Sequence, residues 1–593
     1  MLPFTSKALL CIDSLYNSPV FDSETEESSP IPHRKVSGRF NGTNIDFNIY
    51  LPKDNWEGRF FHLVYPLQSS TADDHAIAFG ADSGGYTVQA SGALGCRADA
   101  ALAKLSRKVA RDYYKQPSRQ IFGYSYGGSG GSLQTIGGIE NTVGVWDGCV
   151  TLIQAVPMSN PNNWPIRALS GLILTDKKDK IKDAFSPGGS GDPSPLLNAA
   201  ESAAFEETTA LGVPREAWED FEGVGQNRTQ LWDSLMTLVV PAVEGADPTY
   251  VDDFWTKSGY LGTEKSPLGD FFRASLVEFN TTVTDVKADG GVATEIVLKD
   301  VPANINTVGL RFTIQNKNGS LGVFDGSLDS KTRTILVRSS SNSDVLDDVT
   351  KGAELQVDNR WYLAVHTLHR HQVPPVESGF YGYDYLRKDG VPRYPQRDVL
   401  IAPKISKSAS GGGTHTGDIK GKVIVMDNLL DFDTFPWHAD WYKNQVKKAL
   451  GSRFKDNYRL YYSDNADHFM GPVKAPMSRR LVDFTGLFEQ YLRDLSAWVE
   501  GGVTPPKETQ YTIKESQVTV PATASERGGI QPVVDLTVGG GKRIQVKVGQ
   551  SVQFKIHAEA PPKTGDVVSV EWDSWCRRVC QARLWQGWSY RRL

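Results

Sequence analysis

A serine flanked by glycines is the feature that most constrains how this chain can fold. The stretch Gly123-Tyr124-Ser125-Tyr126-Gly127 carries glycine two positions before and two positions after the serine. This spacing is typical of a sharp strand-to-helix turn, because a side chain at either glycine would collide with neighbouring backbone. The pattern therefore predicts a tight turn centred on Ser125, with its hydroxyl projecting from the turn.

The surrounding sequence supplies the elements that such a turn requires. Apolar residues recur at helical spacing over 102–113, and 119–122 is typical of a short strand. Small residues over 127–139 favour a helix packed closely on a sheet, and 145–156 forms an apolar, strand-like run. This order of strand, turn, helix and strand predicts an α/β fold with a parallel sheet.

An acid and a histidine follow later in the chain, each behind a predicted strand. The β-branched run 422–426 precedes the acidic residues, and the predicted strand 458–462 precedes a loop that contains His468. The order serine, acid, histidine is that of the α/β-hydrolase fold. The candidate acids are Asp427, Asp431 and Asp433.

These residues together predict a catalytic triad of Ser125, Asp431 and His468, with Asp427 and Asp433 left open as alternative acids. In this hypothesis His468 takes the proton of Ser125 while the serine attacks a carbonyl, and Asp431 orients the imidazole. An acyl-enzyme forms and is then released by water or another nucleophile. The scheme needs no cofactor.

Four stretches also resemble a known family. They are Phe47–Phe61, Asp82–Gly85, the serine motif Gly123–Gly127, and Lys422–Asp431. These stretches resemble the tannase and feruloyl esterase group of serine hydrolases. The resemblance implies an α/β-hydrolase core with an inserted lid, hydrolysis of carboxylic esters, often of aromatic acids, and the triad named above.

The sequence departs from that group in two places. Family members carry a cysteine before the serine and another after the histidine, and here those positions hold Tyr124 and Phe469. The glycine-rich loop expected after 59–64 is replaced by Tyr65–Ser70. For the oxyanion hole we expect one donor from the N–H of Tyr126 and a second from Gln68.

Aromatic residues near the predicted site favour an aromatic or polycyclic acyl group in a small ester or amide substrate. The substrate-binding candidates are Tyr124, Trp164, Trp437 and His438.

A separate histidine cluster, His366, His369 and His371, has no nearby acidic residue in sequence and does not place all three histidines on one face of an extended segment. We therefore expect structural or substrate-contacting histidines there and no metal site.

The length of the chain, 593 residues, predicts several domains. We expect the first part of the core over 1–160, an inserted mixed α/β lid over 161–420 and the second part of the core over 421–510. A β-sandwich-like module, complete or truncated, follows over 511–573, where Val570–Asp573 resembles the PKD-type module, and 574–593 is an irregular tail.

Composition excludes several classes of partner. The net charge is −5 with both signs spread along the chain, which argues against nucleic acid. No run of 18 apolar residues occurs, so we expect no membrane span. The five cysteines are too few and scattered for a disulfide framework. The N-terminal sequence favours a cytoplasmic protein, or a secreted one if the native N-terminus is longer, and a homo-oligomer is left open.

Three alternatives to hydrolysis remain at this point. The same triad could serve an acyltransferase or cyclase, in which an alcohol or amine replaces water, or it could serve a peptidase. A binding protein on a hydrolase fold is the alternative outside enzymology, and the altered loop at Tyr65–Ser70 favours it.

Overall fold

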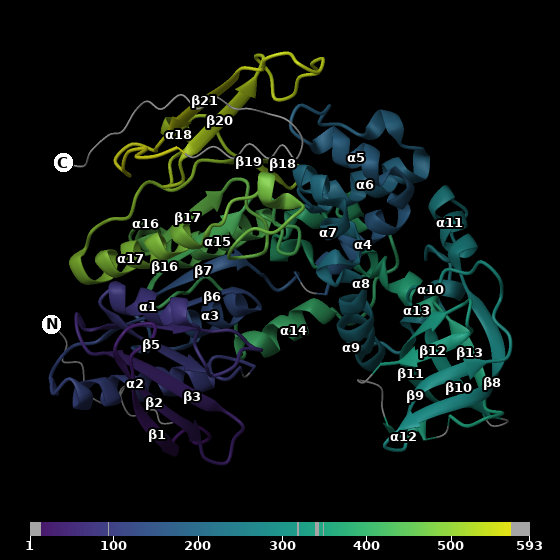
Figure 1. Ribbon diagram of the computed structural model, residues 1–593, viewed down its shortest axis with the longest axis horizontal. Helices are drawn as coiled ribbons and strands as arrows, with labels where there is room; N and C mark the ends of the chain where they lie inside the picture. Colours follow the sequence, from purple (N-terminus) through teal and green to yellow (C-terminus); the bar gives the residue numbers. More distant parts are fainter. Residues whose placement is uncertain are drawn as a thin grey trace.

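The computed structural model describes residues 13–570 apart from 93, 160, 317–318, 339–342 and 348. Its centre is a nine-stranded sheet in which the last six strands in spatial order run parallel and the first three pair antiparallel (Figure 1). In spatial order the strands are β1 (Pro19–Glu27), β2 (His33–Phe40), β3 (Asp46–Pro52), β5 (Gly85–Ala90), β4 (Arg59–Leu63), β6 (Phe122–Ser129), β7 (Gly148–Gln154), β16 (Lys422–Asn428) and β17 (Tyr458–Ser463).

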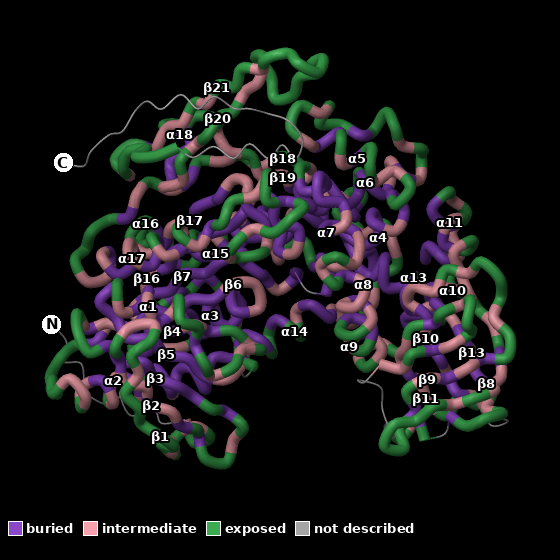
Figure 2. Tube along the Cα trace, viewed as in Figure 1, coloured by how far each residue is buried: buried purple, intermediate pink, exposed green. Residues whose placement is uncertain are grey.

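Helices cover both faces of this sheet, so its parallel strands are buried on both sides, as parallel strands require. One face packs on α2 (Arg97–Tyr113), α3 (Gly130–Asn141) and α15 (Trp437–Leu450). The other face packs on α1 (Asp74–Asp82) and α17 (Thr485–Gly501). Figure 2 shows the resulting buried band along the centre of the sheet. The predicted fold class, an α/β-hydrolase core, is confirmed by this layered sheet.

A long segment between β7 and β16 forms the insertion, residues 155–421. Its helical part begins with α4 (Asn163–Ile173) directly after the loop that follows β7. The sequence pattern over 199–211 predicts a helix, and this stretch coincides with α6 (Ala199–Leu211), whose start is fixed by a capping box of Asn198 and Glu201. The further helices are α5 (Lys178–Phe185), α6 (Ala199–Leu211), α7 (Phe221–Gly225), α8 (Leu231–Ser234), α9 (Val240–Ala246), α10 (Tyr250–Thr256), α11 (Pro267–Ser275), α13 (Arg360–Val365) and α14 (Ile401–Ser410).

The predicted strands of the insertion close into a six-stranded antiparallel barrel with its own apolar core. In Figure 1 the barrel lies at the end of the molecule farthest from β1 and the helices of the insertion lie between it and the sheet. Around the barrel the strands are β10 (Arg311–Asn316), β11 (Gly319–Asp329), β12 (Thr334–Val337), β9 (Val292–Leu298), β8 (Glu278–Asp289) and β13 (Glu354–Asp358), with α12 (Ser343–Leu346) beside them. Among the described residues, no helix has the length and hydropathy needed to cross a membrane.

The C-terminal segment contains less sheet than the sequence predicts. Two separate hairpins are present, β18 (Thr512–Lys514) with β19 (Gln517–Thr519), and β20 (Val533–Val538) with β21 (Phe554–Glu559). Alternation of apolar and polar residues predicts further strands over 543–548 and 567–573. The first is wrong, and so is the described part of the second, 567–570, because both are exposed and make no ladder. A β-sandwich is therefore not formed by the described part, and residues 571–593, with the predicted tail, lie outside the described residues.

Candidate active site

The strand-to-helix turn lies at Ser129, four residues beyond the predicted position. Strand β6 continues through Ser125 and ends at Ser129, and α3 begins at Gly130. Ser129 has φ 54° and ψ −119°, a backbone conformation that a residue with a side chain rarely adopts. We call this strand-to-helix turn the elbow. The sequence predicts the elbow at Ser125, and that position is therefore wrong. A second, overlapping G-x-S-x-G, Gly127 to Gly131, is centred on Ser129.

The close approach of backbone explains why glycine flanks this serine. A Cβ at Gly127 or at Gly131 would lie 2.4 Å from the carbonyl oxygen of Val64. At Gly123 the nearest atoms would instead belong to the side chains of Phe60 and Arg107. The backbone contact at Val64 is the collision that the elbow motif avoids. Gly127 belongs to both patterns, so only the pattern centred on Ser129 has this contact at both of its glycines.

Ser125 lies inside the sheet, where a substrate cannot reach it. Its register partners are His62 on β4 and Cys149 on β7, and its side chain belongs to the face covered by α2 and α3. Ser125 is 1 % exposed, and its hydroxyl has no hydrogen-bond partner among the described residues. Ser129, in contrast, is only partly buried.

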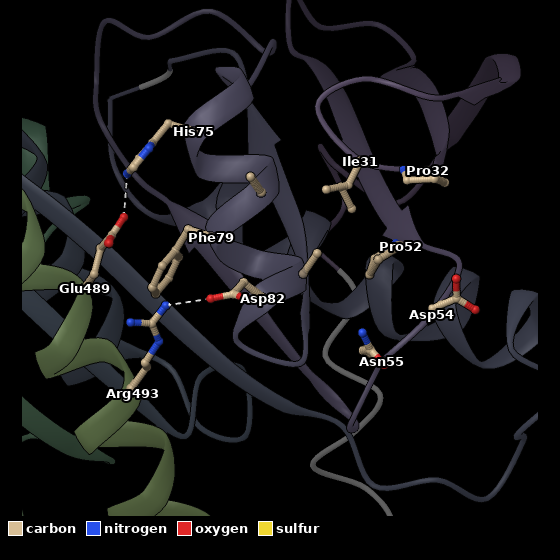
Figure 3. Close-up of a pocket in the computed structure, with 12 residues that line it drawn as sticks. Ile31, Pro32, Pro52, Asp54, Asn55, His75, Phe79, Asp82, Glu489 and Arg493 are labelled. Atoms are coloured by element: carbon tan, nitrogen blue, oxygen red, sulfur yellow. Dashed lines mark hydrogen bonds and ion pairs between the residues drawn. The ribbon is translucent and has the colours of Figure 1, made fainter. Parts of the chain in front are cut away.

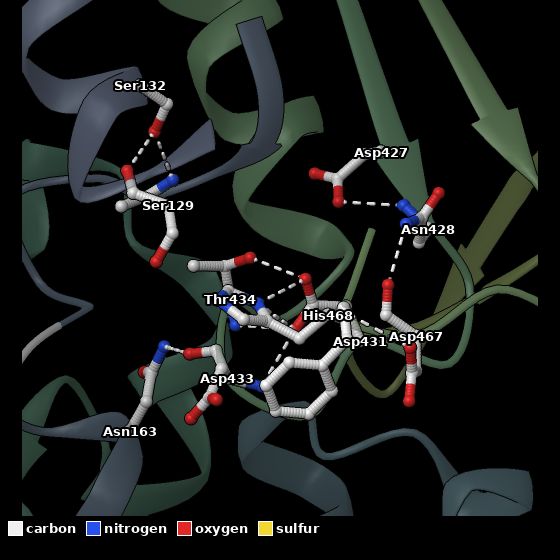
Figure 4. A network of polar contacts seen from close by, with 12 residues as sticks. Ser129, Ser132, Asn163, Asp427, Asn428, Asp431, Asp433, Thr434, Asp467 and His468 are labelled. Carbon is white, nitrogen blue, oxygen red and sulfur yellow. Dashed lines mark hydrogen bonds and ion pairs between the residues drawn. The ribbon is translucent and has the colours of Figure 1, made fainter. Parts of the chain in front are cut away.

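Ser132, in the first turn of α3, stabilises the elbow through two hydrogen bonds. Its hydroxyl donates to the carbonyl oxygen of Ser129 at 2.6 Å and accepts the N–H of Ala155 at 2.9 Å. Figure 4 shows these two bonds, and it shows the Ser129 side chain directed toward the group formed by Asp431, Thr434 and His468. The elbow is thus tied to the loop after β7 on one side and faces the acid and the histidine on the other.

Asp431 and His468 form the hydrogen-bonded pair that the sequence predicts. His468 Nδ1 lies 2.9 and 3.0 Å from the two carboxylate oxygens of Asp431. The N–H groups of Asp433 and Thr434 and the Thr434 hydroxyl donate to the same carboxylate at 2.7 to 2.8 Å. The carboxylate of Asp431 is fully buried, and these three donors together with His468 fix its orientation.

The two other candidate acids have different surroundings. Asp427 is fully buried at the end of β16, and burial together with the charge of Asp431 raises the pKa of its carboxyl well above the usual range. Asp433 accepts the indole N–H of Trp164 at 3.0 Å and pairs with Arg167 at 2.7 Å. Of the three, only Asp431 bonds His468.

Burial and the charge of Asp431 act in opposite directions on the pKa of His468. Burial of the imidazole opposes its protonation, but the carboxylate of Asp431, through its charge and its hydrogen bond, and the nearby Asp433 favour it. The balance raises the pKa of His468 to about 9. The pair is therefore built to stabilise an imidazolium, which is the species that a general base becomes after it accepts a proton.

Neither predicted oxyanion donor lies where it is needed. Tyr126 is within β6, between β4 and β7, and its backbone belongs to the sheet. The side-chain amide of Gln68 donates to the carbonyl oxygens of Leu63 and Ala90, and its backbone N–H donates to the carbonyl oxygen of Tyr65 at 3.4 Å. Helix α3 has no side-chain cap at its first turn, so the N–H of Gly130, the residue after Ser129, is the better candidate for the first donor.

The loop after β4 lies against that helix start. A Cβ on Gly130 would be 3.3 Å from the ring of Pro66, and one on Gly131 would be 3.2 Å from the ring of Tyr65. This is the loop from which the α/β-hydrolase fold draws its second oxyanion donor. The loop is therefore in the expected place, although its sequence differs from the glycine-rich form.

Of the four predicted substrate-binding residues, one borders the site. Trp164 bonds Asp433 beside the acid and is half-buried. Tyr124 lies on the far face of the sheet and donates to Glu500, and Trp437 is packed in the core and donates to Leu211. His438 is buried with Nδ1 3.1 Å from the Ser159 hydroxyl, and burial lowers its pKa to about 3.

The histidine cluster of the insertion is engaged in structural contacts. His369 Nε2 lies 2.9 Å from Glu207, which also pairs with Arg370 at 2.7 Å. His366 Nδ1 and His371 Nδ1 each lie beside a backbone carbonyl oxygen. Within the described part of the chain, no three His, Cys, Asp or Glu side chains gather as a metal site would require.

A cavity of about 530 Å³ lies elsewhere, between α1, α17 and the end of β3 (Figure 3). Its rim carries a His75–Glu489 contact of 2.5 Å and an Arg493–Asp82 pair of 3.2 Å. None of its lining residues belongs to the elbow, to the Asp431 loop or to the His468 loop.

Comparisons with known proteins find similarity among solved structures alone. No protein-family model matches the sequence, and neither does any curated protein. Among solved structures, the chain is similar to a tannin acyl hydrolase from Aspergillus niger, with 13% identity, 91% of this chain and 90% of that chain covered, and a TM-score of 0.36. It is also similar to feruloyl esterase B from Aspergillus oryzae, with 14% identity, 85% and 91% covered, and a TM-score of 0.36. Because the TM-scores stay below 0.5, the assignment of an α/β-hydrolase fold rests on the strand order and on the elbow at Ser129.

Proposed function

We propose that this protein is a serine hydrolase that cleaves a carboxylic ester through an acyl-enzyme on Ser129. The observation that carries the proposal is the strained elbow at Ser129, turned toward a buried Asp431–His468 pair. A positive φ at a non-glycine residue costs free energy, and such strain is typical of a functional site. Asp431 and His468 keep the roles expected from the sequence, and Ser129 replaces Ser125.

In the proposed reaction, Ser129 Oγ attacks the ester carbonyl while its proton passes to Nε2 of His468. Asp431 holds Nδ1 and stabilises the imidazolium. The negative charge on the carbonyl oxygen is stabilised by the N–H of Gly130 and by a donor of the loop at Tyr65–Ser70. The imidazolium then protonates the leaving alcohol as the C–O bond breaks, and water repeats the sequence to release the acid.

Exposed apolar side chains around the elbow support an ester with an apolar or aromatic part. On the loop beside Gly130, Leu67 is 82 % exposed and Tyr65 is 36 % exposed. Beside His468, Phe469 and Met470 are each about half exposed. Exposed apolar side chains gathered at one place are typical of a binding surface. A panel of p-nitrophenyl esters of rising chain length, with methyl ferulate and methyl gallate, tests this proposal.

The direct test is labelling with a fluorophosphonate probe, which reacts with an activated serine. We expect the intact protein and Ser125→Ala to be labelled equally, and Ser129→Ala to lose labelling. Ser125→Ala is the matched control because it removes a hydroxyl from the same strand. Labelling that persists in Ser129→Ala and disappears in Ser125→Ala would overturn the assignment of the nucleophile. Product analysis then distinguishes hydrolysis, which yields a free acid, from transfer to an alcohol or amine.

A further inference from the structure

Asp433 connects the acid of the proposed triad to the first helix of the insertion. Its N–H donates to Asp431 at 2.7 Å. Three side chains of the first turns of α4 approach Asp433 in return: the Asn163 amide donates to its carbonyl oxygen at 2.6 Å, and Trp164 and Arg167 contact its carboxylate. The backbone that orients Asp431 is therefore held by a helix that lies outside the sheet.

Arg167 is the unusual member of this group, because a guanidinium is rarely buried without a full set of partners. It is 1 % exposed, and its Nε has no hydrogen-bond partner among the described residues. Its Nη1 donates to the carbonyl oxygen of Gly223 at 3.3 Å, and its Cζ lies 5.0 Å from the centre of the Phe432 ring. Burial of this charge is costly, and Asp433 is the carboxylate that offsets the cost.

The charged groups around His468 come from several elements. Among them, the positive charge of Arg167 lowers the pKa of His468. Asp431 and Asp433 favour the imidazolium, and Arg167 opposes it. Burial raises the pKa of Asp467, beside His468 in sequence, to about 6, and the charge of Arg228, which itself pairs with Asp220, opposes this rise. The groups that face the site are Asp431, Asp433, Asp467, Arg167 and Arg228, with Asp427 behind Asp431.

We propose that Asp433 and Arg167 are positioning residues of this site: through α4 they hold the Asp431 carboxylate against His468, and their opposite charges balance around the imidazole. The inference rests on the proposed function, since it concerns the same histidine. In this proposal the first helix of the insertion, α4, helps to position the triad, in addition to any role of the insertion as a lid.

The test is the titration of His468 itself, followed by NMR of protein with ¹³C-labelled histidine rings, with the signal assigned by its loss in His468→Gln. In the intact protein we expect a pKa near 9. Asp433→Asn removes a negative charge and should lower the pKa of His468, by roughly one unit. Arg167→Met removes a positive charge and should raise it by a similar amount. Arg167→Lys keeps the charge and should leave the pKa nearly unchanged.

Two controls separate a charge effect from general loosening of the insertion. Glu207→Gln and Arg370→Met break the other buried pair of the insertion, which contacts His369 and does not face His468. We expect them to lower stability and to leave the titration of His468 unchanged. If Arg167→Met does not fold, the double variant Asp433→Asn/Arg167→Met removes both charges, and its His468 pKa should lie close to that of the intact protein.

The outcomes distinguish the two proposals. If Ser129 is labelled by the probe and neither Asp433→Asn nor Arg167→Met moves the His468 titration, the positioning role is overturned and the hydrolase proposal stands. If the pKa of His468 shifts in the same direction in Asp433→Asn and in Arg167→Met, the proposal that these two charges act in opposite directions on His468 is overturned. If the shifts occur as stated and the intact protein is not labelled at Ser129, the proposed function is the part that fails.

Discussion

At the scale of single residues, the site combines a strained serine with a histidine that favours its charged form. Ser129 adopts a backbone conformation that costs free energy, on the order of 1–3 kcal/mol for a residue of its kind, and Ser132 is one of the groups that hold it there. His468 must be neutral to accept a proton, and its pKa near 9 opposes this at neutral pH. The two properties together make the reactivity of Ser129 depend on pH.

This dependence gives a prediction for the rate of probe labelling. With a pKa near 9, roughly one molecule in a hundred carries a neutral His468 at pH 7. The labelling rate should therefore rise about tenfold per pH unit between pH 6 and 8 and level off above pH 9. Ser125→Ala should show the same profile. A rate that is flat from pH 6 to 9 would contradict the charged pair.

At the scale of elements, the elbow depends on how closely β6 and α3 approach the end of β4. The Val64 carbonyl oxygen occupies the space that a side chain at Gly127 or Gly131 would need. Since this oxygen belongs to backbone, it cannot move aside as a flexible side chain could. The packing of three elements thus fixes where the serine can project.

A glycine-to-alanine pair tests this packing. Gly131→Ala should displace α3 from β4, lower stability by about 1–3 kcal/mol and abolish most labelling of Ser129. Gly486→Ala, on the exposed start of α17, meets no atom within 4 Å and should be neutral or slightly stabilising. Thermal unfolding and labelling rate measure both effects. Equal stability and equal labelling rates in Gly131→Ala and Gly486→Ala would show that the close contact between Gly131 and the Val64 carbonyl oxygen is unimportant.

The same packing explains what the sequence could and could not predict. Asp431 and His468 were found because each follows a β-branched or apolar run that ends at the carboxyl edge of the sheet. The serine was missed because two overlapping G-x-S-x-G patterns share Gly127, and both satisfy the spacing. Which serine reaches the edge is decided by the register of β6 against β4 and β7, a pairing between distant segments that local sequence does not encode.

Arg167 and Asp433 were missed as a pair for a related reason. One lies at the start of the insertion and the other in the Asp431 loop, so only the folded chain brings them within 2.7 Å. The insertion itself was predicted from its length, and its α6 and barrel strands from their periodicity. The C-terminal sandwich was predicted from alternation alone, and 543–548 shows that alternation without a partner strand does not make a sheet.

At the scale of the whole molecule, the segment after α17 is divided between core and periphery. β17 is the edge strand of the sheet, and side chains of this segment cover its backbone: Leu460 N–H donates to Glu508, and Tyr462 N–H donates to Thr509. Gln531 bonds both the N–H and the carbonyl oxygen of Asp464, in the loop that leads to His468. The segment up to Gln531 therefore completes the sheet edge, which unpaired strands otherwise leave open.

The hairpin β20–β21 has far fewer ties to the rest. It contacts the core segment where the Ala524 N–H donates to Glu559, and Arg543, in the turn of the hairpin, reaches Asp183 of the insertion at 2.8 Å. Its residues are mostly exposed, in contrast with the buried band of the sheet (Figure 2). Stability and reactivity should therefore depend on where the chain is cut.

Two truncations test this division. A chain that ends at Pro532 keeps the contacts of Glu508, Thr509 and Gln531, and it should unfold cooperatively near the temperature of the intact protein and label at the same rate. A chain that ends at Pro505 removes the side chains that bond the Leu460 and Tyr462 N–H groups, leaves the edge of β17 open and releases the loop before His468. It should unfold at a lower temperature and lose most labelling. If the cut at Pro505 were harmless, the edge of β17 would not need this cover, and if the cut at Pro532 were not tolerated, the hairpin would belong to the core.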